Sequence, residues 1–130
     1  MAWSSVTTSD ALTLTGSFQT IQASAADLEV TMTPGEAAHV QLDYNPQGSP
    51  TEFVEWQILS SPDGGTTYDV VAFDAGVLNF TPDPNILSTI IRDIHTFKIQ
   101  AKLIDTDGTA GGDDTTSTLT VRLRTNNIDL

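Results

Sequence analysis

Two stretches in which apolar and polar residues strictly alternate constrain the fold of this chain more than any other feature. The first is Thr96–Leu103, and the second covers residues 118–124. Their apolar members are Phe97, Ile99, Ala101 and Leu103 in the first, and Leu119, Val121 and Leu123 in the second. A period of two is typical of a strand that buries one face and exposes the other. The segment Asp105–Thr116 between them is rich in Gly and Asp, so we predict that the two strands form an antiparallel pair.

Shorter runs with the same alternation recur along the chain, and turn-forming residues separate them. The clearest are residues 28–32, 38–44 and 54–58. Ile86, Ile90 and Ile94 follow one another at intervals of four, which favours a short helical turn over residues 86–94, although a crossover with one strand would also fit. About seven to nine short strands with frequent turns predict an all-β fold, an antiparallel two-sheet β-sandwich.

The chain has the length and composition of one domain. Its 130 residues, 38% of them hydrophobic, suffice for a hydrophobic core. Residues 1–10 are rich in Ser and Thr and are interpreted as a flexible or partner-dependent arm, so the sandwich domain is expected to span residues 11–130. Trp3 should either pack back onto its own domain or anchor on a neighbouring copy, because a large aromatic side chain is costly to leave in water. The absence of cysteine excludes disulfides and thiolate chemistry.

The chain is strongly acidic, and its charges are unevenly distributed. The net charge is -12, and all five basic residues lie in the last 39 positions. So anionic a surface repels phosphate backbones, which argues against nucleic acid as a partner. Four of the bases occupy outward positions of the two strands described first, and they are Lys98, Lys102, Arg122 and Arg124. We expect these bases to form one cationic stripe, which either pairs with local carboxylates or docks on another copy or on an acidic partner surface.

No catalytic constellation stands out, so we expect neither an enzyme nor a bound cofactor. The two histidines, His39 and His95, have no third ligand at a spacing that would hold a metal. The chain lacks a Gly-x-Ser-x-Gly elbow and a phosphate-binding loop, and nothing singles out one pair among its 17 carboxylates. We also expect no signal peptide and no membrane span, because no apolar run is long enough.

Four aspartates in one Gly-rich segment are weak candidates for a calcium site, and they are Asp105, Asp107, Asp113 and Asp114. The spacing of the first two matches the start of a calcium-binding loop. Ala110 and Thr116 stand where such a loop needs Gly and Glu. A solvated hairpin loop is therefore favoured, and no metal site is predicted.

Part of the chain resembles an immunoglobulin-like or fibronectin-III-like domain. Leu42 stands where the first cysteine of that fold would be, and Trp56 follows at the distance expected of its core tryptophan. Residues 93–99 resemble the Asp-x-x-x-Tyr-x-Cys pattern, with Phe97 for Tyr and Ile99 for Cys. The resemblance implies that these four side chains lie in the core. It also implies that burial alone holds the sheets together and that the corner hydrogen bond of the tyrosine is missing.

A second resemblance is to small structural proteins of tailed bacteriophages. The hairpin at residues 58–69 contains the Ser-x-Asp-Gly sequence seen in them, and residues 121–126 resemble their closing strand, Val-Arg-Leu-Arg-x-Asn. The acidic, cysteine-free composition is similar too. The resemblance implies a head-decoration (cement) or accessory virion protein that is assembled in the host cytoplasm. It would bind a major capsid protein or another virion protein, often as a trimer. We expect its contacts at Trp3 and at the four bases of the stripe.

A carbohydrate-binding or adhesion module, with or without calcium, is the alternative function. Such a module needs exposed aromatic side chains along a groove. The candidates are Tyr44, Tyr68 and Phe73. Either function would make the protein a binding module without catalysis.

Overall fold

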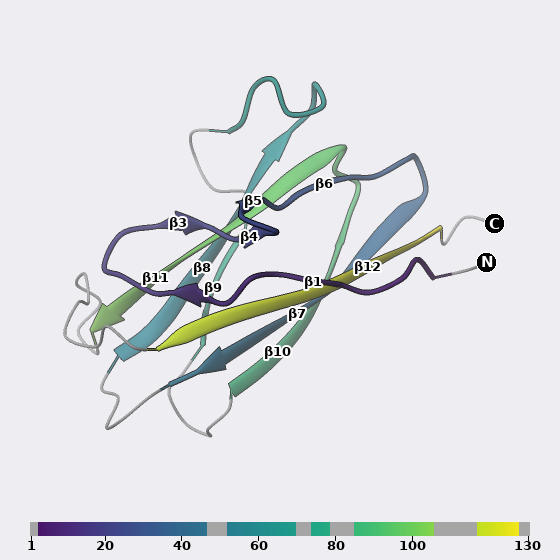
Figure 1. The fold of residues 1–130 in the computed structure, drawn as a ribbon. Coiled ribbons are helices and arrows are strands. Elements are labelled where there is room, and N and C mark those ends of the chain that lie inside the picture. The colour runs from purple at the N-terminus through teal and green to yellow at the C-terminus, as the bar shows by residue number, and fades with distance from the viewer. Residues whose placement is uncertain (1–2, 47–51, 70–73, 79–84, 106–116, 128–130) are drawn as a thin grey trace.

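The computed structural model describes residues 3–46, 52–69, 74–78, 85–105 and 117–127, which form two antiparallel β-sheets packed face to face (Figure 1). The strands are β1 (Thr7–Thr8), β2 (Leu12–Thr13), β3 (Gln19–Thr20), β4 (Gln22–Ala23), β5 (Ala26–Asp27), β6 (Glu29–Thr31), β7 (Glu36–Asn45), β8 (Glu52–Ser61), β9 (Asp74–Leu78), β10 (Asn85–Arg92), β11 (Thr96–Asp105) and β12 (Thr118–Asn127). The predicted all-β, two-sheet β-sandwich is confirmed. More strands are present than predicted, because the N-terminal part forms six strands of two or three residues each.

Each of the two large sheets has five strands. Sheet A has the order β1–β12–β7–β10, and β2 also pairs with β12. Sheet B has the order β3–β11–β8–β9, and β6 also pairs with β11, whereas β4 and β5 form a separate hairpin. The central pairs, β7 with β12 and β8 with β11, are formed by strands of ten residues each. These four long strands supply most of the two facing surfaces.

The two strands with the strictest alternation lie in different sheets, so the predicted pairing of residues 96–103 with residues 118–124 is wrong. β11 pairs with β8, and β12 pairs with β7. Alternation shows that one face of a strand is buried, but it does not identify the strand alongside. The connection between β11 and β12 therefore crosses from one sheet to the other and does not close a hairpin.

The order of the strands is that of a jelly roll. From β7 onward, the chain changes sheet at every connection except the one between β8 and β9. An immunoglobulin domain instead keeps its last two strands in one sheet. The immunoglobulin-like prediction therefore holds for the architecture of two packed sheets, whereas the strand order corrects its topology.

Residues 85–92 form strand β10, so the helical turn predicted near residues 86–94 is wrong. The strand pairs with β7 over all eight of its residues. An interval of four residues fits both structures, because it is close to one helical turn and is also a multiple of two. Pairing with β7 selects the strand.

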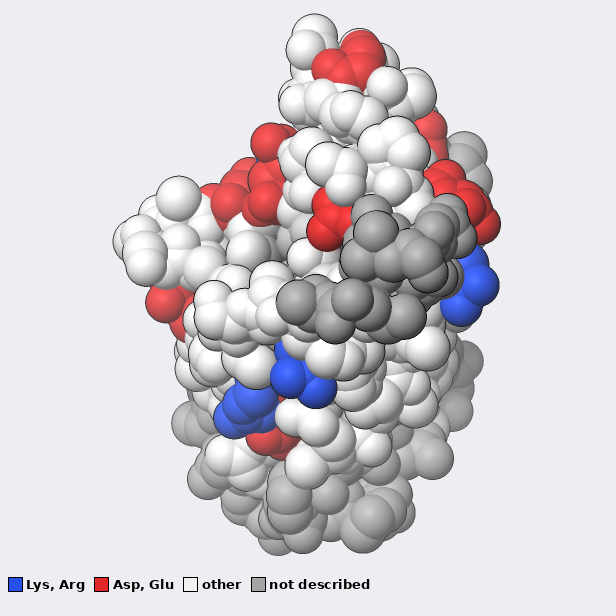
Figure 2. All heavy atoms as spheres, turned by 90° about the vertical axis from the view of Figure 1, so that its right-hand side faces the viewer, with Lys and Arg blue, Asp and Glu red and all other residues white. Residues whose placement is uncertain are grey.

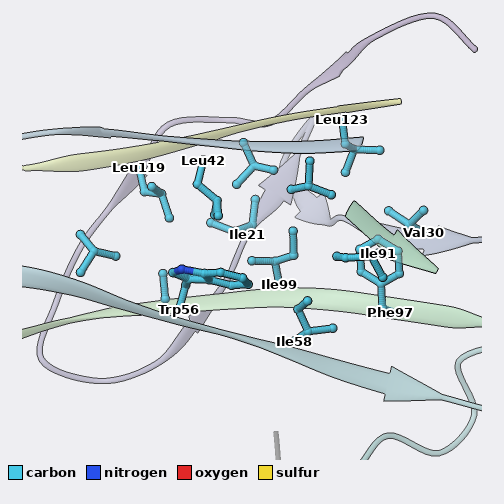
Figure 3. Packing of buried hydrophobic residues seen from close by; sticks show 14 of the residues in the cluster. Ile21, Val30, Leu42, Trp56, Ile58, Ile91, Phe97, Ile99, Leu119 and Leu123 are labelled. Atoms are coloured by element: carbon cyan, nitrogen blue, oxygen red, sulfur yellow. The ribbon is translucent and has the colours of Figure 1, made fainter. Parts of the chain in front are cut away.

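The core lies between the sheets and contains the four side chains that the immunoglobulin-like resemblance places there. Leu42 and Phe97 are fully buried, Ile99 is 2% exposed and Trp56 is 4% exposed. Figure 3 shows the Trp56 indole lying flat between the sheets, below Leu42. Gly76 on β9 is the register partner of Trp56, and a Cβ placed there would lie 2.7 Å from the indole Nε1. The indole therefore packs against the strand backbone at a position without a side chain.

We predict that Gly76→Ala destabilises the protein by about 1–3 kcal/mol, the usual cost of overpacking a core. The added methyl group would displace the Trp56 indole within a closed layer of side chains. Urea unfolding followed by circular dichroism measures the change. Val77→Ala on the same strand is the control, because the Val77 side chain is 52% exposed. A Gly76→Ala variant as stable as Val77→Ala would contradict this account of the core.

Candidate docking face

The N-terminal stretch, predicted to be a flexible or partner-dependent arm, lies along β12 from Trp3 onward. The Ser4 N–H donates a hydrogen bond to the Thr125 carbonyl at 2.9 Å, and β1 pairs with β12. Ser9 is 7% exposed, and its Oγ accepts a hydrogen bond from the Val121 N–H at 2.8 Å. These contacts place Trp3 over the outer side of sheet A.

Trp3 packs against its own domain and still presents half of its surface to solvent. It forms a β-bridge with Asn126, and the Arg124 guanidinium carbon lies 4.6 Å from the ring centroid of the indole. The His39 ring lies 6.3 Å from Trp3, centroid to centroid, at an interplanar angle of 59°. The arginine makes a cation–π contact, worth about 0.5–1 kcal/mol at an exposed site. The indole remains 47% exposed, so a partner can still contact it.

The register of sheet A aligns side chains from β12, β7 and β10 in rows across its outer side. The rows are Arg124–His39–Ile90, Arg122–Gln41–Ser88 and Thr120–Asp43–Ile86. Because side chains alternate along a strand, all of them project away from the core. Ile86 is 53% exposed and Ile90 is 60% exposed. We define the docking face as these three rows together with Trp3 and Val6.

A hollow of about 260 Å³ lies within the docking face. It is lined by Val6, His39, Gln41, Arg122, Leu123 and Arg124. Arg122 Nη1 lies 3.2 Å from Asp43 Oδ2 and 3.5 Å from Gln41 Oε1, so its charge is partly neutralised. Within the described part of the chain, Arg124 forms no ion pair with a carboxylate. The hollow thus combines apolar walls with guanidinium N–H groups that can bind an anion.

The basic side chains lie on two faces of the molecule, so the predicted single cationic stripe is wrong. Arg122 and Arg124 belong to β12 in sheet A, whereas Lys98 and Lys102 belong to β11 in sheet B. The outer sides of the two sheets point in opposite directions. Figure 2 shows the basic side chains in separate small groups and the acidic ones spread over the upper part of the view. Trp3 and the two arginines stay together, and the two lysines are separated from them.

Both lysines are engaged by side chains of their own domain. Lys98 pairs with Asp27 at 3.3 Å, and Lys102 pairs with Glu55 at 3.8 Å. Each ammonium nitrogen also lies 4.6 Å from the centroid of an aromatic ring. These contacts match the alternative expectation for the bases, local pairing with carboxylates, which contributes at most about 1 kcal/mol per exposed pair.

No candidate metal centre is found among the residues that the structure describes. They contain no group of three or more His, Asp or Glu side chains that could hold a metal ion. His39 and His95 line two different hollows. Asp105 ends β11, and the other weak calcium candidates lie outside the described residues: Asp107, Asp113 and Asp114. In the same described ranges, no helix is long and apolar enough to cross a membrane.

The aromatic candidates for a carbohydrate groove are not brought together. Tyr44 is fully buried on β7, and Phe73 lies outside the described residues. Tyr68 is partly buried and donates a hydrogen bond to Glu29. Burial, with this hydrogen bond as the second cause, raises the pKa of the Tyr68 phenol above its usual value. The exposed aromatic side chain beside a hollow is instead Trp3.

The hairpin with the Ser-x-Asp-Gly sequence is organised by Asp63. Its Oδ1 accepts hydrogen bonds from Ser61 Oγ at 2.7 Å and from the Thr67 N–H at 2.8 Å. Gly64 and Gly65 follow with φ of 75° and 100°, a region that only glycine enters without strain. Both hydrogen bonds favour the ionised carboxylate, and they lower the pKa of Asp63 to about 2, with the Ser61 hydroxyl as the larger cause.

We predict that this hairpin remains ordered at mildly acidic pH and loosens as the pH falls towards 2. The pKa of Asp63 is lowered from 3.8 to about 2, so ionised Asp63 stabilises the fold above pH 3.8, and this contribution is lost as the pH falls through about 2. The chemical shift of the Thr67 amide proton, followed by NMR against pH, should have its midpoint near the lowered value. Asp63→Asn should abolish that titration, and a midpoint at 3.8 or above would contradict the prediction.

Ile86, Ile90 and Val6 belong to the docking face, although the sequence does not identify them as contact residues. Neighbouring residues of a strand point to opposite sides, so each adjacent pair of apolar residues in β10 places one side chain outside. These adjacent apolar residues indicate outward side chains only if residues 85–92 are recognised as a strand. Val6 offers no such signal, because its position is set by the pairing of β1 with β12.

No family model matches the chain, and neither a curated protein nor a solved structure matches it. The function is therefore argued from the residues and the geometry of the docking face.

Proposed function

We propose that this protein is a non-enzymatic structural protein of a bacteriophage virion. It decorates or cements the capsid surface and stabilises the virion through protein–protein contacts of its docking face, as a symmetric homo-oligomer. The observation that carries this proposal is the half-exposed indole of Trp3, which contacts Arg124. Ile90, in the same row of sheet A as Arg124, is exposed as well.

The composition of the docking face is that of a protein interface. Tryptophan and arginine are over-represented among the residues that contribute most to binding between proteins, and Trp3 and Arg124 lie in contact here. Four of the six large apolar side chains exposed in the described part of the chain are on this face: Trp3, Val6, Ile86 and Ile90. Single exposed apolar side chains are ordinary, but several on one side form a patch that suits a partner.

The docking face also differs in charge from the rest of the chain. Arg122 and Arg124 project from it, Arg92 lies in the adjoining row, and Asp43 is the carboxylate within its three rows. The whole chain has a net charge of -12. A local excess of positive charge on an acidic body would orient the protein on an acidic shell, and it would set specificity more than affinity.

The jelly-roll topology is compatible with this function, because it occurs in viral capsid proteins as well as in lectins. It does not select between the two, since one fold hosts many functions. Support for the phage assignment comes instead from the resemblance of the Asp63 hairpin and of strand β12 to phage structural proteins.

We predict that Arg124→Glu weakens binding to purified capsids that lack this protein by at least about tenfold, a loss of roughly 1.4 kcal/mol. The substitution reverses one charge on the docking face and removes the cation–π contact to Trp3. Co-sedimentation of the protein with the capsids measures the binding.

Lys102→Glu is the matched control, because it makes the same change of charge on β11 in sheet B. It should leave capsid binding within about twofold of the unmodified protein, since an exposed ion pair contributes little. Failure of the unmodified protein to co-sediment, or equal losses in both variants, would contradict the proposal.

A carbohydrate-binding or adhesion module is the second candidate, and the hollow beside Trp3 favours it. Trp3 contacts Arg124, and Arg124 and Gln41 line the hollow, so an aromatic ring and N–H donors lie near each other as a sugar ring and its hydroxyl groups require. Titration with a panel of glycans, with and without calcium, separates the two candidates. Glycan binding that is lost in Trp3→Ala would support the module, and capsid binding without glycan binding would support the virion protein.

A further inference from the structure

Strand β10 is the one long free edge among the described strands. It ends sheet A and pairs with β7 on one side over all of its eight residues. The opposite edge of sheet A is formed by β1 and β2, with two residues each. Sheet B ends in β9, with five residues, and in β3 and β6, with two and three. Of the strands that the structure describes, only β10 therefore offers a long row of backbone N–H and C=O groups to another strand.

The sequence of β10 lacks the features that usually protect such an edge. Soluble proteins place charges, proline or a bulge on exposed edge strands, because an unprotected edge pairs with other chains. Residues 85–91 contain no charged residue, no proline and no glycine. The register to β7 is unbroken, so no bulge is present. Ile86 and Ile90 project outward at 53% and 60% exposure, and Leu87, which faces the core, is still 37% exposed at the free edge.

We propose that β10 pairs with β10 of a second copy of this chain, antiparallel, across a two-fold axis that passes between the two Ser88 residues. This register places Ile86 opposite Ile90 of the second copy, and Ile90 opposite its Ile86. Both residues project outward, so the pairing keeps the outer side of one sheet continuous with that of the other. Directly opposed isoleucines would shield part of their exposed apolar surface from water. A shift by two residues would place Ser88 opposite an isoleucine and lose both pairs.

The sequence of β10 fits a second copy at this edge, because Ile86 and Ile90 lie symmetrically about Ser88 and no residue from 85 to 91 is charged. Two molecules with a net charge of -12 repel each other, and β10 contributes no carboxylate to the contact. Arg92 ends β10 and adds one positive charge at each end of the contact, and Asp43 is the register partner of Ile86 on β7. The two Arg92 residues are about eight strand residues, or about 27 Å, apart. This exceeds the screening length of roughly 8–10 Å, so the two arginines do not repel each other appreciably.

The pairing joins the two five-stranded sheets A into one continuous sheet and sets both docking faces on the same side. If the proposed function holds, the dimer would bind two sites of the capsid shell at once. Once one docking face is bound, the other binds its own site as an intramolecular step, which raises the overall affinity although the interface at each site is unchanged. The two-fold pairing gives a dimer in place of the trimer that the phage resemblance implies.

Cysteine cross-linking tests the register directly, because the chain has no cysteine of its own. Ser88→Cys places two thiols opposite each other across the axis. Opposed residues of an antiparallel pair have Cα atoms about 4.5–5.5 Å apart, within the range of about 4.4–6.8 Å that a disulfide spans. Mild oxidation should convert most of this variant to a covalent dimer. Ile90→Cys is the matched control, since its counterpart would lie about 14 Å away.

Light scattering of the unmodified protein and of Ser88→Asp completes the test. The unmodified protein should have the mass of a dimer, and Ser88→Asp, which opposes two carboxylates at the axis, should weaken the dimer at least about tenfold. A monomer at every concentration, or cross-linking of Ile90→Cys as fast as that of Ser88→Cys, would overturn the proposal. A dimer that does not bind capsids would overturn the proposed function alone. A monomer that binds capsids would overturn the β10 pairing and the homo-oligomer of the proposed function, and would leave docking on the capsid intact.

Discussion

The structure depends on the burial of two apolar sheet faces against each other. The four long strands β7, β8, β11 and β12 send every second side chain into one layer, in which the Trp56 indole rests on the backbone at Gly76. No disulfide assists this packing, because the chain has no cysteine. Burial occupies one side of each strand, and the other side is left for solvent or for partners. The strands themselves can therefore contact partners only through their outer sides and through the edges of the sheets.

The two outer sides are not equivalent. On sheet B, Lys98 and Lys102 are paired with carboxylates and covered by aromatic rings of the same domain. On sheet A, the N-terminal stretch adds Trp3 beside Arg124, and the free edge adds Ile90 in the same row. On sheet B both lysines are engaged, whereas on sheet A four of the six exposed large apolar side chains and a guanidinium without an ion pair among the described residues remain. This asymmetry is the physical basis for assigning binding to sheet A and to its edge.

The sequence predicts the class of the fold well, because alternation is a local property that each strand shows by itself. Burial of Trp56 and Phe97 follows from that pattern and from their places in it. Strand pairing is not local: residues 96–103 and 118–124 have the same pattern, and nothing in it reveals that each belongs to a different sheet. The error about the cationic stripe follows from the error about pairing. Ile86 and Ile90 show a different limit, since a spacing of four suits a helix and a strand equally until a neighbouring strand is known.

Collisional quenching of tryptophan fluorescence by acrylamide tests the central claim most directly, because the chain has only two tryptophans, Trp3 at 47% exposure and Trp56 at 4%. The free protein should show one accessible and one protected indole, and the proposed docking predicts that the accessible one becomes protected when the protein is bound to purified phage capsids. Trp56 serves as an internal reference in both states. Equal quenching of the two indoles in the free protein would contradict the packing of the core. An accessible indole that stays unchanged in the bound protein would contradict docking through the outer side of sheet A.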